Sequence, residues 1–124
     1  MNKSKSVLLI GWDPEVTDYS KWPGMTKESL SSALAKSRQR LLDDGYEARW
    51  CLLTSAESAE SEVRAELQDR AYDCILIGGG VRVAPGAFTV FEKVVNAIHE
   101  LAPAGKICFN TSLDDIAESA KRWL

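Results

Sequence analysis

The chain has little of what marks several large classes of protein. It has 124 residues, one histidine and three cysteines, and its 15 basic and 18 acidic residues leave a net charge of only −3. A balance this mild offers no electrostatic basis for binding nucleic acid or an anionic membrane, so neither partner is expected. The apolar run near the N-terminus, Val7 to Ile10, is too short for a signal segment or a membrane span.

The positions of the cysteines also argue against disulfide bonds. Cys51, Cys74 and Cys108 all fall inside apolar segments and have no C-x-x-C spacing. An odd number of such residues indicates buried free thiols in a reducing compartment, so a cytoplasmic location is predicted.

What is present is a regular alternation of strand-like and helix-like segments. Residues 7–12 and 73–77 are continuously apolar, which is typical of strands covered on both faces. The segments 46–53 and 106–109 are more mixed or shorter and are expected at the edges of a sheet. Between and after them lie four helical patterns, at about 27–44, 56–70, 86–101 and from Ser112 to near Trp123.

Residue types at the helix ends support these boundaries. Thr26 and Ser55 are expected N-caps, and Gly45 is expected to end the first helix. Pro85 suits the first turn of the third helix, and Ser112 with Asp115 resembles a capping box for the fourth.

This alternation predicts an α/β fold in which residues 1–124 form a single domain. Strands that alternate with helices form a parallel sheet through right-handed crossovers. With the two apolar strands in the middle, the strand order is 2-1-3-4, a flavodoxin-like sheet between two layers of helices.

The strand order predicts where a ligand would bind. Ligands of open parallel sheets lie beyond the carboxyl ends of the strands, where the order reverses. Here the reversal falls between the first and third strands, so the segments 11–25, 78–84 and 110–112 converge on one rim.

The chemistry of these segments favours a small anionic ligand. Gly78, Gly79 and Gly80 permit close approach to main-chain N–H groups, the third helix begins just beyond them, and Arg82 can donate two hydrogen bonds to a phosphate or carboxylate. The alternative is that the glycines only turn the chain and that Arg82 pairs with a surface carboxylate. The run matches neither the Walker loop nor the dinucleotide-binding motif. The other predicted ligand-binding residues are Trp12, Tyr19, Asn110, Thr111 and Ser112.

Two carboxylates are candidates for catalysis. Asp13 and Asp18 lie in the long loop after the first strand, and either could act as a general base or hold a metal ion. Each could equally be a turn-forming residue, as Asp13 before Pro14 indicates. No metal site is predicted, no cofactor is indicated, and whether the protein is an enzyme is left open.

The predicted topology resembles that of flavodoxins and response-regulator receiver domains, but the residues depart from both. The phosphate loop of flavodoxins is rich in hydroxyls, whereas this chain has Gly11-Trp12-Asp13-Pro14-Glu15 in that place. Receivers carry a phosphorylated aspartate where this chain has Gly78. A working phosphoryl switch is therefore not expected.

Nearly the whole chain resembles a family of short bacterial α/β proteins of uncharacterised function. The blocks that carry this resemblance are Val7–Gly11, Trp22–Gly24, Tyr72–Arg82 with Pro85, and Ile107–Thr111. The resemblance implies no particular activity.

A second hypothesis belongs to another class of function. The chain could be a non-catalytic, receiver-like interaction module. The short fourth strand leaves an open sheet edge, and the chain ends in the apolar pair Trp123-Leu124. A homodimer through the last helix and that edge would cover both.

Overall fold

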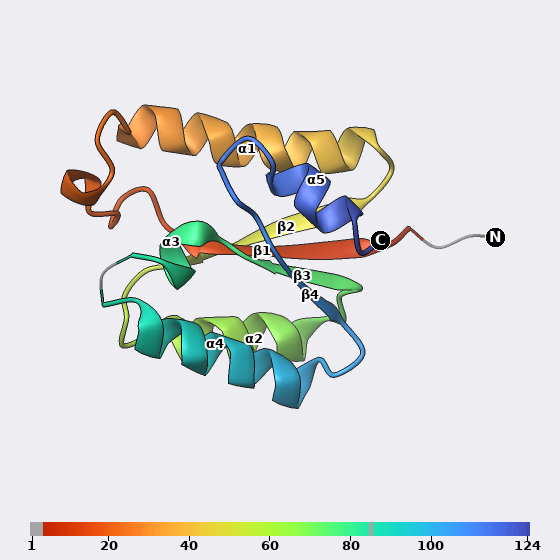
Figure 1. Cartoon of the computed structure of the whole chain (residues 1–124). Coiled ribbons are helices and arrows are strands. Elements are labelled where there is room, and N and C mark those ends of the chain that lie inside the picture. Colours follow the sequence, from red (N-terminus) through yellow and green to blue (C-terminus); the bar gives the residue numbers. More distant parts are fainter. Residues whose placement is uncertain (1–3, 85) are drawn as a thin grey trace.

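A single parallel sheet organises the protein (Figure 1). The computed structural model describes residues 4–84 and 86–124. The strands are β1 (Ser6–Trp12), β2 (Glu47–Leu53), β3 (Cys74–Ile77) and β4 (Lys106–Phe109), and their order is β2-β1-β3-β4. All three pairings are parallel. The predicted fold class and strand order are therefore confirmed.

The burial of the strands follows the apolar patterns in the sequence. The side chains of residues 7–10 in β1 and 74–77 in β3 have no exposed surface. The edge strands β2 and β4 mix buried and exposed positions. The unbroken apolar runs thus mark the central pair, because those strands have a helix layer on each face.

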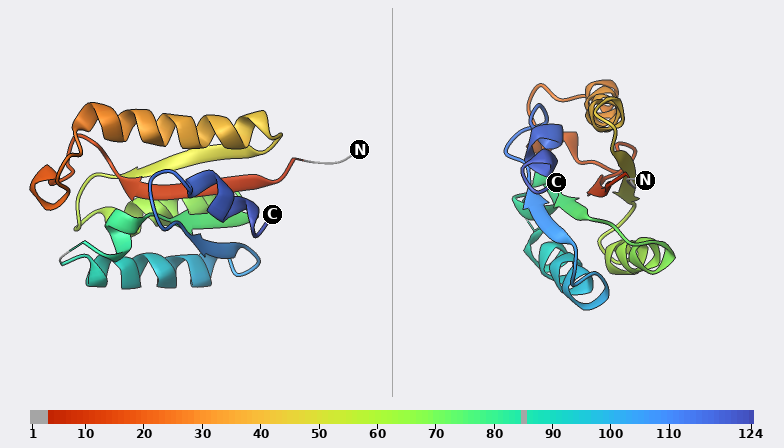
Figure 2. Two further views of the ribbon diagram at one scale, coloured as in Figure 1. Left: turned by 45° about the horizontal axis from the view of Figure 1, so that its top comes forward. Right: turned by 90° about the vertical axis from the view of Figure 1, so that its right-hand side faces the viewer.

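Helices form a layer on each face of the sheet, as the two views of Figure 2 show. α1 (Lys27–Asp43) and α5 (Ile116–Lys121) contact each other on one face. α2 (Ala59–Asp69) and α4 (Phe88–Leu101) pack together on the other. Two core clusters result, one beneath each layer.

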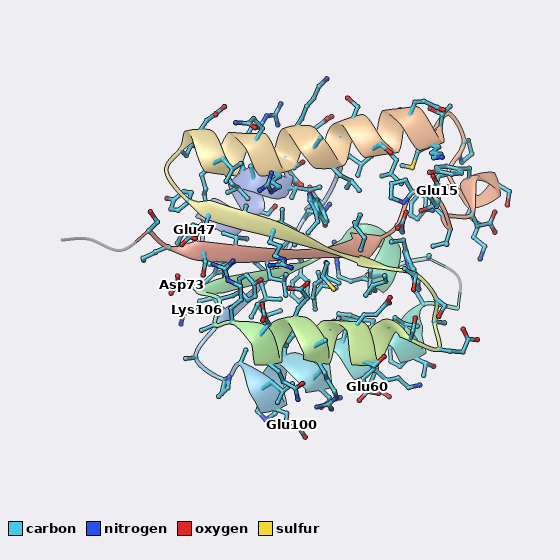
Figure 3. All side chains as sticks on the ribbon, turned by 180° about the vertical axis from the view of Figure 1, so that it is seen from behind. Glu15, Glu47, Glu60, Asp73, Glu100 and Lys106 are labelled. Carbon is cyan, nitrogen blue, oxygen red and sulfur yellow. The ribbon has the colours of Figure 1, made fainter. Side chains whose placement is uncertain are left out.

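Charged side chains lie at the outer surfaces of this assembly. Figure 3 shows Glu47, Asp73 and Lys106 gathered at the amino ends of the strands, and Glu15 at the opposite end of the molecule. The carboxylate of Asp73 accepts a hydrogen bond of 2.8 Å from the backbone N–H of Ser6. The amino end of the sheet is therefore polar and separate from the rim at which the ligand is predicted.

Three predicted helix starts are wrong by two to four residues. α2 begins at Ala59, because the hydroxyl of Ser55 accepts the N–H of Ser58 in a turn that precedes the helix. α5 begins at Ile116, because the Asp115 carboxylate accepts N–H groups of the preceding loop instead. α4 begins at Phe88. The prediction for Pro85 lies outside the described residues.

Two short elements were not predicted from the sequence. The one-turn helix α3 (Gly79–Arg82) directly follows β3, and the 3-10 helix η1 (Tyr19–Lys21) lies in the loop after β1. Figure 1 shows η1 projecting beyond the carboxyl ends of the strands. Both elements belong to the rim.

No helix within the described ranges is long and apolar enough to cross a membrane.

The loop that carries η1 ends in a capping box that fixes the start of α1. The Thr26 hydroxyl accepts the N–H of Ser29, and the Ser29 hydroxyl accepts the N–H of Thr26. Replacing Thr26 with alanine should lower the free energy of unfolding by about 1 kcal/mol, because one N–H of the first turn loses its partner. Urea denaturation measures this loss. Thr26→Ser, which keeps the hydroxyl, should restore most of the stability, and an equal loss in both variants would contradict the capping role.

Candidate functional site

A cavity of about 180 Å³ lies at the carboxyl end of the sheet, on the face covered by α1 and α5. It lies where the strand order reverses between β1 and β3, as the topology predicts for a ligand site. Five parts of the chain meet there: the end of β1 with its loop, the start of α1, the edge strand β2, the glycine segment after β3, and the loop that leads into α5. The lining residues are Gly11, Trp12, Thr17, Trp22, Met25, Leu30, Leu34, Trp50, Gly78, Gly79, Gly80, Val83, Asn110, Thr111, Ser112, Leu113 and Ile116.

The glycine segment is held against β1 by a main-chain contact. The N–H of Gly78 donates a hydrogen bond of 2.8 Å to the carbonyl oxygen of Ile10. A Cβ atom at residue 78 would lie only 2.9 Å from that oxygen, so this position requires glycine. The contact places Gly79 and Gly80 in the first turn of α3, where their N–H groups have no partner within the helix.

Trp12 fixes the other side of the same segment. Its indole N–H donates a hydrogen bond of 3.0 Å to the carbonyl oxygen of Gly80. A Cβ atom at Gly80 would lie 3.2 Å from Cδ1 of the indole, so the ring and the main chain are in tight contact. Trp12 and the three glycines thus form one rigid wall of the cavity.

The guanidinium of Arg82 is used within the protein. Its Nε donates to the carbonyl oxygen of Ile77 at 3.0 Å, and its Nη2 donates to the carbonyl oxygen and the side-chain oxygen of Asn110. The group also lies 5.2 Å from the centroid of the Phe109 ring. Burial lowers the pKa of Arg82, and Asp115 acts in the opposite direction.

The sequence left two roles open for Arg82, contact with a ligand and an ion pair with a surface carboxylate. The residue is not part of the cavity lining, and it makes no ion pair with any described carboxylate. Instead it joins the ends of β3 and β4. A direct ligand contact by Arg82 stays a prediction.

The loop before α5 lines the cavity with two hydroxyl-bearing residues and is held by one carboxylate. Asp115 accepts hydrogen bonds from the N–H groups of Thr111 and Ser112 and from the Thr111 hydroxyl. The buried Asn110 donates from Nδ2 to the carbonyl oxygen of Ser112 at 2.8 Å. The Ser112 hydroxyl accepts the N–H of Asp114 and has no hydrogen-bond acceptor among the described residues, so its proton is available to a ligand.

The loop after β1 places the two candidate catalytic residues differently. Asp13 does not line the cavity, and its carboxylate accepts the N–H of Glu15, as expected of a turn-forming residue. Asp18 caps η1 and accepts both the N–H and the hydroxyl of Ser20. These hydrogen bonds lower the pKa of Asp18, which makes it a weaker base. A catalytic role for either residue stays a prediction.

Tyr19, a predicted ligand residue, also lies outside the lining. Its hydroxyl donates a hydrogen bond of 2.7 Å to the carbonyl oxygen of Pro14, and its ring packs against the core beneath α1 and α5. In this arrangement Tyr19 shapes the loop.

The aromatic part of the site includes a residue that the sequence did not indicate. Trp50 comes from the edge strand β2, and its indole N–H donates to the carbonyl oxygen of Leu34 at 2.9 Å. Its ring covers Gly11, where a Cβ atom would lie 3.1 Å from Cζ3. The available signal was the register, which pairs Gly11 with Leu52 two residues beyond Trp50.

A second cavity, of about 300 Å³, lies on the other side of the loop. Trp12, Thr17 and Trp22 line both cavities and so form the partition between them. The second cavity contains Asp18 and Lys21, whose charged groups are 3.8 Å apart. It lacks the glycine wall and the loop before α5, so most of the predicted ligand residues gather at the first cavity.

The thiols lie away from both cavities. All three cysteines are free and buried, as predicted. Desolvation, together with Glu66 and Glu62, raises the pKa of Cys51 to about 12. Such a thiol is a poor nucleophile at neutral pH. No group of three or more metal-ligating side chains occurs in the described part of the chain.

Comparison with known proteins bears on the fold. No protein-family model and no curated protein matches the chain. The solution structure of a phosphate-loop protein aligns with 97% of this chain and 88% of its own chain, with a TM-score of 0.52 and 20% identity. At that identity the likeness supports the α/β architecture alone. The resemblances to a bacterial family and to receivers stay predictions.

The contact at Gly78 can be tested by a matched pair of variants. Gly78→Ala should lower the free energy of unfolding by about 1–3 kcal/mol, because the new methyl group is forced against Ile10 O. Gly79→Ala meets no atom closer than 3.8 Å and should change stability by less than about 0.5 kcal/mol. Urea denaturation of both variants provides the measurement. Equal losses of unfolding free energy would show that the close approach to Ile10 is not the cause of the destabilisation.

The loop before α5 should make stability depend on pH. Partial burial acts to raise the pKa of Asp115, but the hydrogen bonds from Thr111 and Ser112 and the charge of Arg122 outweigh it, so the pKa lies below the usual value. The stabilisation is present above the unfolded-state pKa of about 3.9 and is lost as the pH falls through the lower folded-state value. Asp115→Asn should therefore flatten the fall in unfolding free energy between about pH 5 and pH 2.

The control for this pH dependence is Asp69→Asn, at an exposed position of α2 that makes none of these contacts. It should keep the wild-type slope. A slope unchanged in the Asp115 variant would show that this carboxylate is not held as described.

Proposed function

We propose that the protein binds a small molecule in the 180 Å³ cavity, through a phosphate or carboxylate group held between the glycine wall and the loop before α5. The observation that carries the proposal is the gathering of seven predicted ligand residues around one cavity at the switch point of the sheet. These are Trp12, Gly78, Gly79, Gly80, Asn110, Thr111 and Ser112.

The cavity offers neutral donors for such a group. The N–H groups of Gly79 and Gly80 and the hydroxyl of Ser112 come from two separate elements that line the same space. Backbone N–H groups and hydroxyls commonly donate hydrogen bonds to phosphate oxygens. Among the described lining residues none is charged, so the ligand would be held by hydrogen bonds rather than by an ion pair.

In this proposal Arg82 acts through its neighbours. By bonding Ile77 and Asn110 it fixes the ends of β3 and β4, from which the two donor segments extend. Its positive charge also favours an anion near the rim. The structural likeness to a phosphate-loop protein is consistent with a phosphate-type ligand.

The alternative, an interaction module that forms a homodimer, has less support. Lys106 N–H bonds to Asp73 of the neighbouring segment, so Ile107 and Phe109 present their main-chain groups to the open edge of β4. Arg122 donates to the carbonyl oxygen of Phe109 at 3.3 Å and so occupies one acceptor of that edge. A homodimer through this edge stays a prediction.

Thermal unfolding with a panel of anions tests the binding. The panel contains inorganic phosphate, phosphate monoesters and small carboxylates. A ligand at a hundred times its dissociation constant should raise the free energy of unfolding by about 2.7 kcal/mol. If no member of a broad panel stabilises the protein, the proposed function is wrong.

A matched pair of serine variants tests whether Ser112 contributes to anion binding. Ser112→Ala removes the hydroxyl of a residue that lines the cavity and should weaken binding about fivefold, which corresponds to about 1 kcal/mol. Ser31→Ala, on the exposed side of α1, should leave affinity unchanged. Equal affinities of the two variants would show that the anion binds elsewhere.

A further inference from the structure

Beyond the polar donors, the cavity is unusually aromatic. Three of the four tryptophans in the chain line it: Trp12, Trp22 and Trp50. They come from the end of β1, from the loop after it and from the edge strand β2, so three segments separated in sequence converge. All three side chains are half-buried, as expected for walls of a space that a ligand can enter.

Two of these rings are fixed by hydrogen bonds to the main chain. The indole N–H of Trp12 bonds to Gly80 O, and that of Trp50 bonds to Leu34 O. Their only hydrogen-bond donors are therefore already paired within the protein. The rings can offer a ligand their apolar surface and the negative electrostatic potential of their faces.

The rest of the lining is uncharged and includes aliphatic side chains such as Leu30, Leu34 and Ile116. Gly11, Gly78, Gly79 and Gly80 contribute no side chains, and Met25 adds a polarisable thioether of the kind that contacts aromatic rings well. A space of about 150 Å³ admits a benzene ring. The observed volume of about 180 Å³ is thus suited to one ring, or to two fused rings that reach the opening.

We infer that the ligand carries a planar aromatic ring which lies among Trp12, Trp22 and Trp50, while its anionic group contacts the donors at the glycine wall and Ser112. This inference rests on the proposed function, whose anionic group it extends with a second part. Three tryptophan rings in the lining favour a planar ring over a puckered aliphatic one of similar size, because offset stacking adds to the burial of apolar surface.

Trp22 is the residue at which recognition of the ring can be tested without disturbing the core. It lies in the loop and belongs to neither core cluster, whereas Trp12 and Trp50 pack against them. Trp22→Phe keeps an aromatic face, and Trp22→Leu replaces it with an aliphatic side chain. Trp123→Leu is the matched control, because Trp123 is 51% exposed and lies outside both cavities.

The experiment compares four probes by calorimetry and by quenching of tryptophan fluorescence: phenyl phosphate, cyclohexyl phosphate, inorganic phosphate and phenol. We expect phenyl phosphate to bind at least fivefold more tightly than cyclohexyl phosphate, and more tightly than inorganic phosphate or phenol alone. Trp22→Leu should reduce the preference for phenyl over cyclohexyl phosphate to less than twofold. Trp22→Phe and Trp123→Leu should keep it.

The outcomes separate the two proposals. If cyclohexyl phosphate binds as tightly as phenyl phosphate, or if Trp22→Leu keeps the full preference, the aromatic inference is overturned while anion binding stands. If phenol binds as tightly as phenyl phosphate with the same dependence on Trp22, the ring site is supported and the proposed anion site is overturned. If none of the four probes binds, both are overturned.

Discussion

The hydrogen bond from Gly78 to Ile10 is the contact on which the rim of this protein depends. It joins the ends of the two central strands after the regular pairing between them has finished. Because residue 78 can approach Ile10 so closely, the chain turns at once into α3. That turn brings Gly80 beside Trp12, and it directs Arg82 back to the ends of β3 and β4. One wall of the cavity and the support behind it therefore follow from a single close approach.

The layered fold could be predicted because it depends on patterns that neighbouring residues determine. The unbroken apolar runs in β1 and β3 identify the central strands, and alternation with helices makes the sheet parallel. The helix starts were less predictable, because Ser55 and Ser112 form turns that compete with capping. α3 was missed for a different reason. Glycines are poor helix formers, and the turn depends on tertiary contacts of Gly78, Gly80 and Arg82 that the local sequence does not reveal.

The candidate site likewise has one aspect that could be predicted from the sequence and one that could not. Its position follows from strand order, so the segments that meet there could be named from the sequence. The directions of individual side chains could not, since they depend on partners distant in sequence. Arg82 bonds to main-chain oxygens that become available only where β3 and β4 end, and Trp50 reaches the cavity because Gly11 leaves room above β1. The polar loops and Trp12 were conspicuous in the sequence, whereas Trp50 came from an ordinary position in the edge strand β2.

The relative contributions of the polar donors and of the tryptophan walls to the binding free energy determine how a ligand would be recognised. A neutral hydrogen bond contributes about 1 kcal/mol net, and a carboxylate at Asp115, behind the hydroxyl loop, opposes the approach of a strongly charged anion. Burial of an apolar group the size of a phenylalanine side chain contributes about 1.5–3 kcal/mol. The tryptophan walls would thus supply more of the affinity than any single donor, and the donors would fix the orientation. Such a site would distinguish ligands first by their ring and only then by their charged group.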